Sequence, residues 1–174
     1  MQDKIRIMES LVDREINREN KMTEVNEFKK LNKLGNIEET YYISKLLKQT
    51  KPKSPFEEVS KLILCLTGIE GENNHGREDR QISLIGSPAL EWILAEGKIS
   101  ICGAKFKANI HIAQSIADLK IGDRLQMGTS IIDITSSGKK CYSDICSAYE
   151  EDRRCPMQDE IKFARVIQAG EIKL

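Results

Sequence analysis

The chain has 174 residues, 40% of them hydrophobic, and its 27 basic residues balance its 27 acidic residues. The length fits one domain with an appendage or two small units. Balanced charge argues against a general attraction to nucleic acid or to an anionic membrane. No apolar run approaches the roughly 18 residues of a membrane span, and the start, MQDKIRIMES, lacks the apolar segment of a signal peptide. We therefore expect a cytoplasmic protein.

Residues 1 to about 50 carry apolar side chains at helical spacing. The pattern predicts a first helix with an apolar stripe from Ile5 to Ile16, a second that ends at Gly35, and a third from Asn36 to Leu47. We expect residues 1–53 to form a helical N-terminal extension. It would either dock on its own chain or pair with a second subunit in a homodimer.

A further helix is predicted from Ser54 to Gly68, because a capping serine, a first-turn proline and an early acid follow one another at its start. This helix would lead into a second domain, residues 54–174. Cys65 lies within its apolar residues and is interpreted as a small buried hydrophobe.

Beyond Gly68 the sequence changes to short apolar runs separated by polar or glycine-containing turns. Many short strands with turn signals favour a barrel or a sandwich. The predicted fold class is α+β, a mixed, strand-rich β-barrel with an N-terminal α-helical extension. A helix is expected to open at Ser87, and strands are expected at residues 81–85, 99–101, 108–112, 124–127, 130–135 and 163–167.

Three of the five cysteines lie between Gly138 and Pro156. An odd number cannot pair completely within one chain, which favours free thiols or metal ligands. Two lysines, Lys139 and Lys140, directly precede Cys141. Neighbouring cations favour the thiolate, which is the reactive form and a soft metal ligand. Cys141 is therefore the candidate functional thiol, and the alternative is an inert, buried cysteine.

Cys141, Cys146 and Cys155 follow the spacing C-x4-C-x8-C, which is not a usual zinc pattern. Together with His75 from a distant loop they could still form a tetrahedral zinc site. Alternatively, Cys146 or Cys155 could resolve a persulfide or disulfide on Cys141. Otherwise Cys146 packs and Cys155 is an exposed loop thiol.

Several segments, in order, resemble the motifs of one family. The similar segments are GIEG with His75-Gly76 (family GIEGDxHxG), RQISL at 80–84 (RQVSL), FKANI at 106–110 (FxENI), IGDRL with Gly128 (VGDRLxxG), GKKC at 138–141, and CPM, FARV and GEI within 155–172. This order resembles the MOSC domain, the C-terminal domain of molybdenum cofactor sulfurases, which also occurs in small stand-alone bacterial proteins. Two differences are Glu72, where the family usually has aspartate, and Ala108, where it has glutamate.

The resemblance implies that Cys141 carries sulfur or ligates the molybdenum of a bound molybdenum cofactor. The candidate residues around that ligand are His75, Arg77, Arg80, Asn109 and Lys139. Arginine side chains suit its phosphate, and an amide suits the polar edge of its pterin. The alternative for Arg77 and Arg80 is solvation, because the sequence REDR alternates in charge and could satisfy itself.

The expected function is therefore molybdenum cofactor binding or sulfur carriage. A pyridoxal phosphate domain is not recognisable, so the partner would be a sulfur-donor protein or a molybdenum enzyme. Two alternatives are a non-catalytic zinc-binding module built on Cys141, Cys146 and Cys155, and a molybdenum-dependent reductase of N-hydroxylated compounds.

Overall fold

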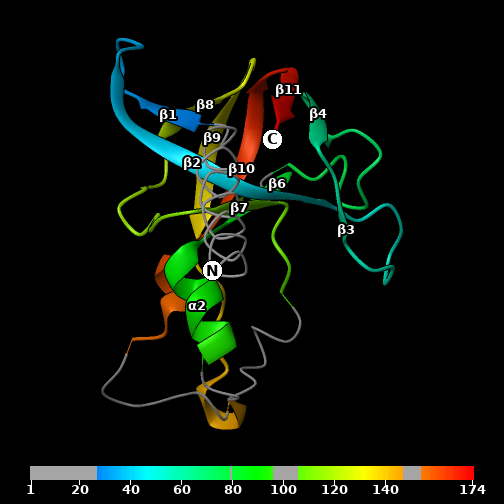
Figure 1. Ribbon diagram of the computed structural model, residues 1–174, viewed down its shortest axis with the longest axis vertical. Helices are drawn as coiled ribbons and strands as arrows, with labels where there is room; N and C mark the ends of the chain where they lie inside the picture. The colour runs from blue at the N-terminus through cyan, green and yellow to red at the C-terminus, as the bar shows by residue number, and fades with distance from the viewer. Residues whose placement is uncertain (1–26, 79, 96–105, 147–153) are drawn as a thin grey trace, which may run out of the picture.

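The computed structural model describes residues 27–78, 80–95, 106–146 and 154–174 (Figure 1). Seven strands form a closed barrel, because β1 pairs with both β8 and β2. Around the barrel they are β1 (Glu27–Leu31), β8 (Arg124–Met127), β9 (Ser130–Ser137), β10 (Ile161–Gln168), β6 (Ile82–Gly86), β7 (Ile110–Ile112) and β2 (Ile37–Lys48). Neighbours are antiparallel except β6 and β7, which are parallel.

Two smaller units complete the strand structure. The short strand β3 (Glu57–Glu58) pairs with the end of β2. A separate three-stranded sheet has the order β11 (Gly170–Lys173), β4 (Lys61–Cys65) and β5 (Gly68–Ile69), and it lies beside the upper part of the barrel in Figure 1. The last described strand is thus hydrogen-bonded to β4.

The barrel interior is apolar and closely packed. Along β9, Ser130, Ile132 and Ile134 are buried in alternation, as expected for a strand with one face on the core. Phe28 and Tyr41 stack inside with ring centroids 4.8 Å apart. Isoleucine and other β-branched side chains suit such a pleated, buried surface.

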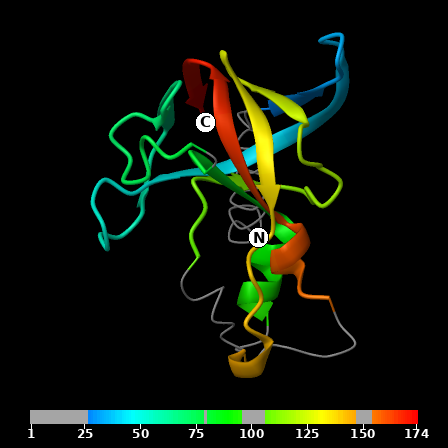
Figure 2. The ribbon, with the colours of Figure 1, turned by 180° about the vertical axis from the view of Figure 1, so that it is seen from behind.

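The helices α2 (Ser87–Ala95) and α4 (Pro156–Asp159) lie below the barrel in Figure 2. A second apolar cluster lies around them. It joins Ala89 of α2 and Met157 of α4 to Phe163 of β10, with Phe106 and Cys155 at its margin. Among the described residues no helix has the length and apolar character that crossing a membrane would require.

The structure confirms the strand-rich barrel, the predicted strands that correspond to β6 through β10, and helix α2. The helices predicted within residues 27–48 are wrong, because these residues form β1 and β2, two strands of the barrel. In β2, Tyr41 and Ile43 point inward, and a bulge between Ile43 and Lys45 then brings Leu46 inward. The bulge breaks the period of two, so the apolar spacing imitates that of a helix.

The helix predicted from Ser54 to Gly68 is also wrong, because this segment forms β3, β4 and β5. Leu62 and Leu64 are buried while Ile63 is 45% exposed, which is strand alternation. Cys65 is partly exposed rather than buried. The helix predicted before residue 27 and the strand at 99–101 lie outside the described residues.

Candidate anion-binding pocket

A hollow of about 270 Å³ gathers basic, aromatic and amide side chains from segments far apart in the sequence. Four of the five predicted cofactor-binding residues are among those that line it, although their role in binding stays a prediction. The lining residues are Phe56, Asn74, Arg77, Arg80, Ser83, Phe106, Lys107, Asn109, Lys139 and Phe163.

The described lining of this pocket carries four cationic side chains and no carboxylate. Two of the cations lie over aromatic rings: the Arg80 guanidinium is 4.7 Å from the centre of Phe163, and Lys139 Nζ is 4.6 Å from that of Phe106. The two rings meet edge to face, with centroids 6.1 Å apart. Cation–π contacts of this kind hold a charged group without neutralising it. The pocket is therefore suited to an anion with a flat, partly apolar body.

Asn109 is buried beneath the pocket and connects three parts of the barrel. Its Oδ1 accepts hydrogen bonds from the Ser83 hydroxyl at 2.7 Å and from the Ser83 N–H at 3.1 Å. Its own N–H donates to Ser83 Oγ, and its Nδ2 donates to the Leu47 carbonyl at 3.4 Å. The amide thus fixes the pocket floor, and one of its two Nδ2 hydrogens is not used by these contacts.

The loop from Gly71 to Arg80 brings Asn74 and the two arginines to the pocket. Glu72 is buried, and its Oε2 accepts a hydrogen bond from the N–H of Asn74. The residue that replaces the usual family aspartate therefore holds the loop in place.

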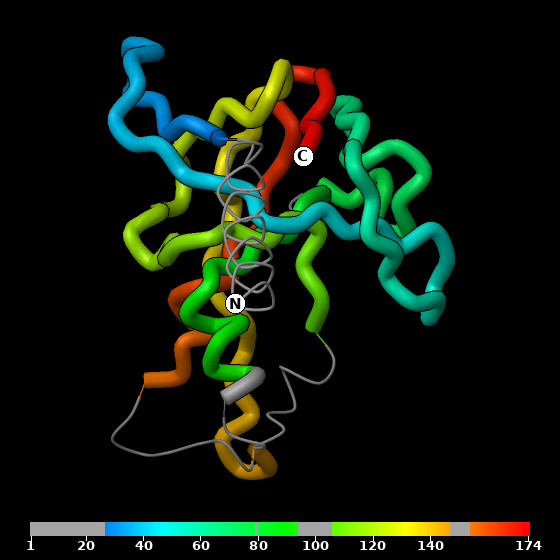
Figure 3. Tube along the Cα trace, viewed as in Figure 1, coloured from blue at the N-terminus to red at the C-terminus, as the bar shows by residue number. Residues whose placement is uncertain are grey.

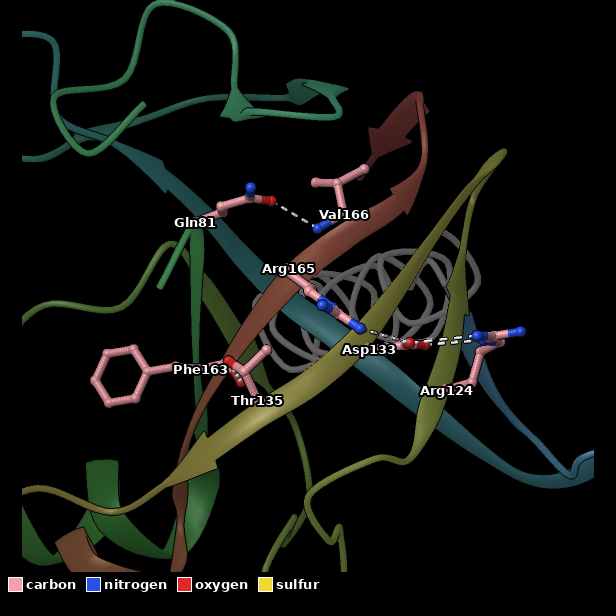
Figure 4. A network of polar contacts seen from close by, with 7 residues as sticks. All are labelled: Gln81, Arg124, Asp133, Thr135, Phe163, Arg165 and Val166. Atoms are coloured by element: carbon pink, nitrogen blue, oxygen red, sulfur yellow. Dashed lines mark hydrogen bonds and ion pairs between the residues drawn. The ribbon is translucent and has the colours of Figure 1, made fainter. Parts of the chain in front are cut away.

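The end of that loop is attached to β10. Gln81 donates from Nε2 to the Leu66 carbonyl at 3.0 Å and accepts the Val166 N–H at 2.7 Å (Figure 4). On the other side of β10, the Thr135 hydroxyl donates to the Phe163 carbonyl at 3.1 Å. The aromatic wall at Phe163 is thus held between β6 and β9, in which Phe163 pairs with Ser83 and Ser136.

Gly138 sets the direction of the backbone just before Lys139 and Cys141. Its φ is +71°, and an added Cβ would lie 2.6 Å from the carbonyl oxygen of Gln158. Its N–H donates to the Ile161 carbonyl at 2.8 Å. Only glycine combines this left-handed conformation with such a close backbone approach. This geometry delivers Lys139 to the pocket.

Cys141 follows two residues after Lys139 and is partly exposed, but it is not among the described residues that line the pocket. The segment that holds Cys141 runs from the lower end of β9 to a short 3-10 helix, η1 (Ser143–Ile145), which lies at the bottom of Figure 3. Cys146 follows η1, and Cys155 caps α4 and packs on the second apolar cluster.

His75 does not line the pocket either. Its Nε2 is 2.9 Å from Thr67 Oγ1, and its Nδ1 is 3.1 Å from the Ile69 carbonyl oxygen. In the part of the chain that the structure describes, no group of three or more His, Cys, Asp or Glu side chains could hold a metal ion. The proposed tetrahedral zinc site of three cysteines and His75 is therefore not assembled among these residues.

Six lining residues are not predicted from the sequence: Phe56, Asn74, Ser83, Phe106, Lys107 and Phe163. Phe106 and Lys107 stand in the FKANI motif, and Ser83 in RQISL, so attention to whole motifs could have found them. Phe56 carried no signal, because it lies in a segment that was predicted to be a helix.

These features define a class: a small β-barrel protein with a basic, aromatic-walled pocket. The model of the MOSC domain family matches residues 71–173, so the chain belongs to this family. No curated protein matches the sequence.

Solved structures share the fold. The YuaD protein of Bacillus subtilis is 17% identical over 76% of this chain and 91% of its own, with a TM-score of 0.55. YiiM of Geobacillus stearothermophilus is 19% identical over 74% of this chain and 69% of its own, with a TM-score of 0.50. A third structure, described as a hypothetical protein, has 18% identity and a TM-score of 0.54; the match covers 76% of this chain and 63% of that one. At these identities the likeness shows the fold alone.

Proposed function

We propose that this chain binds molybdenum cofactor in the basic pocket, and that Cys141 carries sulfur for the cofactor or ligates its molybdenum. The observation that supports the proposal is the pocket lining, with four cations and no carboxylate among its described residues, in a member of the MOSC family. Four cationic side chains gathered around one hollow attract an anion, because like charges repel at short range and an anion relieves that repulsion.

The donor set fits the chemistry of that cofactor. Arg77 and Arg80 offer planar donors for its phosphate. The amides of Asn74 and Asn109 suit the polar edge of the pterin, and the faces of Phe106 and Phe163 suit its flat surface. A volume of about 270 Å³ accommodates part of the ligand, so the remainder would extend out of the pocket. When bound, the group supplies a molybdenum centre that accepts a soft sulfur ligand.

In this proposal the chain's own residues have separate roles. Lys139 neutralises the charge of the ligand in the pocket. Cys141 stands two residues further along the same segment, outside the pocket lining, where its thiol would meet the part of the ligand that extends out of the pocket. In this proposal the partner is a sulfur-donor protein or a molybdenum enzyme. Delivery to that partner requires an accessible thiol, and Cys141 is partly exposed.

Lys139 and Lys140 provide a matched pair for the test. Lys139 lies over Phe106 in the pocket, whereas Lys140 is exposed and lies over Tyr142. The protein is produced in a host that makes the cofactor, and the bound pterin is oxidised to its fluorescent form and quantified. We expect Lys139→Gln and Arg80→Gln to lower bound pterin by about tenfold or more, since a charged hydrogen bond contributes about 1.5–3 kcal/mol, and Lys140→Gln to retain it.

Equal pterin in Lys139→Gln and Lys140→Gln would overturn binding in this pocket. The thiol role is tested separately by Cys141→Ser. This variant should retain bound pterin, and under mass spectrometry it should lack the added sulfur atom that the wild type carries after incubation with a sulfur donor. Added sulfur on the variant equal to that on the wild type would assign the role to another cysteine.

A further inference from the structure

A second group of chemically active side chains lies where the loop after β5 folds back on the β4–β5 turn. Cys65 Sγ is 3.2 Å from Thr67 Oγ1 and 3.3 Å from the Gly68 carbonyl oxygen, and it is 3.9 Å from His75 Nδ1. The loop is tied to the turn by the Gly76 N–H, which donates to the Thr67 carbonyl at 2.7 Å. A thiol, a hydroxyl and an imidazole are therefore gathered from two segments of the chain.

The contacts of the imidazole define its tautomer. A carbonyl oxygen can only accept, so the Nδ1 that lies 3.1 Å from the Ile69 carbonyl carries the proton. Nε2 of neutral His75 is then an acceptor, and the Thr67 hydroxyl donates to it at 2.9 Å. The remaining lone pairs of Thr67 Oγ1 face the Cys65 thiol, so its S–H has two acceptors within reach, the Gly68 carbonyl oxygen and Thr67 Oγ1.

This arrangement gives the thiol proton a route to a base. The proton passes from Cys65 Sγ to Thr67 Oγ1 while the hydroxyl proton passes to His75 Nε2. After the transfer, both imidazolium N–H groups have acceptors, in Thr67 and the Ile69 carbonyl, and the Thr67 hydroxyl donates to the thiolate. A nucleophile within hydrogen-bonding reach of a base that a third group orients is the arrangement of covalent catalysis.

We propose that Cys65 is a peroxide-reactive thiol, oxidised to a sulfenic acid with Thr67 and His75 as its proton relay. The thiolate sulfur attacks one oxygen of hydrogen peroxide; an S–O bond forms and the O–O bond breaks. Sulfur loses two electrons and the peroxide gains them. The departing hydroxide receives the relayed proton and leaves as water, so the sum is thiol plus peroxide to sulfenic acid plus water.

This site is separate from the pocket and from the proposed role of Cys141. Cys65 is partly exposed, and Thr67 and His75 are exposed, so a small peroxide can reach the sulfur. None of the three is among the described residues that line the pocket. The inference therefore does not rest on cofactor binding.

The test traps sulfenic acid. The full chain, free of cofactor, is treated with low hydrogen peroxide in the presence of dimedone, and the labelling rate of each cysteine is measured by peptide mass spectrometry. We expect Cys65 to be labelled several-fold faster than Cys146, which lies outside this cluster and serves as the control within the same sample.

Thr67→Val removes the relay hydroxyl with almost no change of volume, and His75→Gln removes the base. Both should lower the labelling rate of Cys65 several-fold and leave that of Cys146 unchanged. Thermal unfolding is followed for both variants, and if either fails to fold, the comparison of Cys65 with Cys146 in the wild type decides. Labelling of Cys65 no faster than that of Cys146, or equal labelling in Thr67→Val and the wild type, overturns the proposal.

Discussion

The barrel interior and the pocket share strands β6 and β10 but are organised in opposite ways. Along β6, Leu84 is buried in the apolar core while its neighbour Ser83 lines the pocket. Along β10, Ala164 lies in the core and Phe163 forms the pocket wall. The interior gathers buried apolar side chains, whereas the pocket lining gathers four cationic side chains. Stability and ligand binding should therefore depend on different faces of the same strands.

The largest expected difference in the free energy of unfolding is between a substitution in the barrel interior and one in the pocket. Leu84→Ala should lower the free energy of unfolding by about 2–5 kcal/mol, because it leaves a cavity in the interior. Arg77→Ala, at an exposed pocket position, should change it by no more than about 0.5 kcal/mol. Chemical denaturation measures both. A comparable loss in the two variants would show that the pocket is part of the folding core.

Asn109 tests whether the pocket floor belongs to the scaffold. Asn109→Ala removes the acceptor for the Ser83 N–H and hydroxyl, and a buried group left without a partner costs about 1–3 kcal/mol. We expect that loss in the free energy of unfolding. The control is Asn74→Ala. It keeps the hydrogen bond from the backbone N–H of residue 74 to Glu72 and should therefore have a small effect on the free energy of unfolding. Equal effects of the two changes would assign both amides to the same role.

Gly138→Ala should affect both regions moderately. The left-handed backbone and the close carbonyl of Gln158 together predict a cost of about 1–3 kcal/mol. Because Lys139 is displaced with its neighbour, bound pterin should also fall. Gly122→Ala provides a control, since Gly122 also has a positive φ, of +92°, but has no atom within 4 Å of an added Cβ. A Gly138 variant no less stable than the Gly122 variant would show that the close approach can relax.

The smallest expected effect is a pH dependence of the free energy of unfolding, caused by His111 of β7. Burial first, then the neighbouring Lys45 and Lys107, lower the pKa of His111 to about 4. The unfolded chain, with the ordinary value of 6.5, therefore binds more protons between these two pH values. The stability that His111 contributes is present above pH 6.5 and is lost as the pH falls towards about 4, and solvent screening of this partly exposed side chain keeps the loss small.

Denaturation at a series of pH values checks this prediction, and His111→Gln should flatten the dependence in that interval. An unchanged pH profile in the variant would show that other groups control acid stability.

Much of the second half of the fold could be predicted from the sequence alone. The strands β8 and β9 stand between glycine turns, and their alternation is simple; α2 opens with a serine and a proline. The motif order also identified the MOSC family before any coordinates, because short motifs combined in a fixed order are specific even when each one is weak. The sequence also predicts Arg77, Arg80, Asn109 and Lys139 as ligand-binding residues, and the structure places them around one hollow.

Tertiary structure alone decided the rest. Residues 27–48 have the apolar spacing of a helix, but the bulge in β2 and the pairing of β1 with both β2 and β8 make them barrel strands. Burial against partners far away in sequence outweighs local propensity. His75 was expected near the ligand, yet the folded-back loop turns its ring towards Thr67 and Cys65. Motifs determine which residues are present in a loop; the direction in which each side chain points depends on the contacts that hold the loop in place.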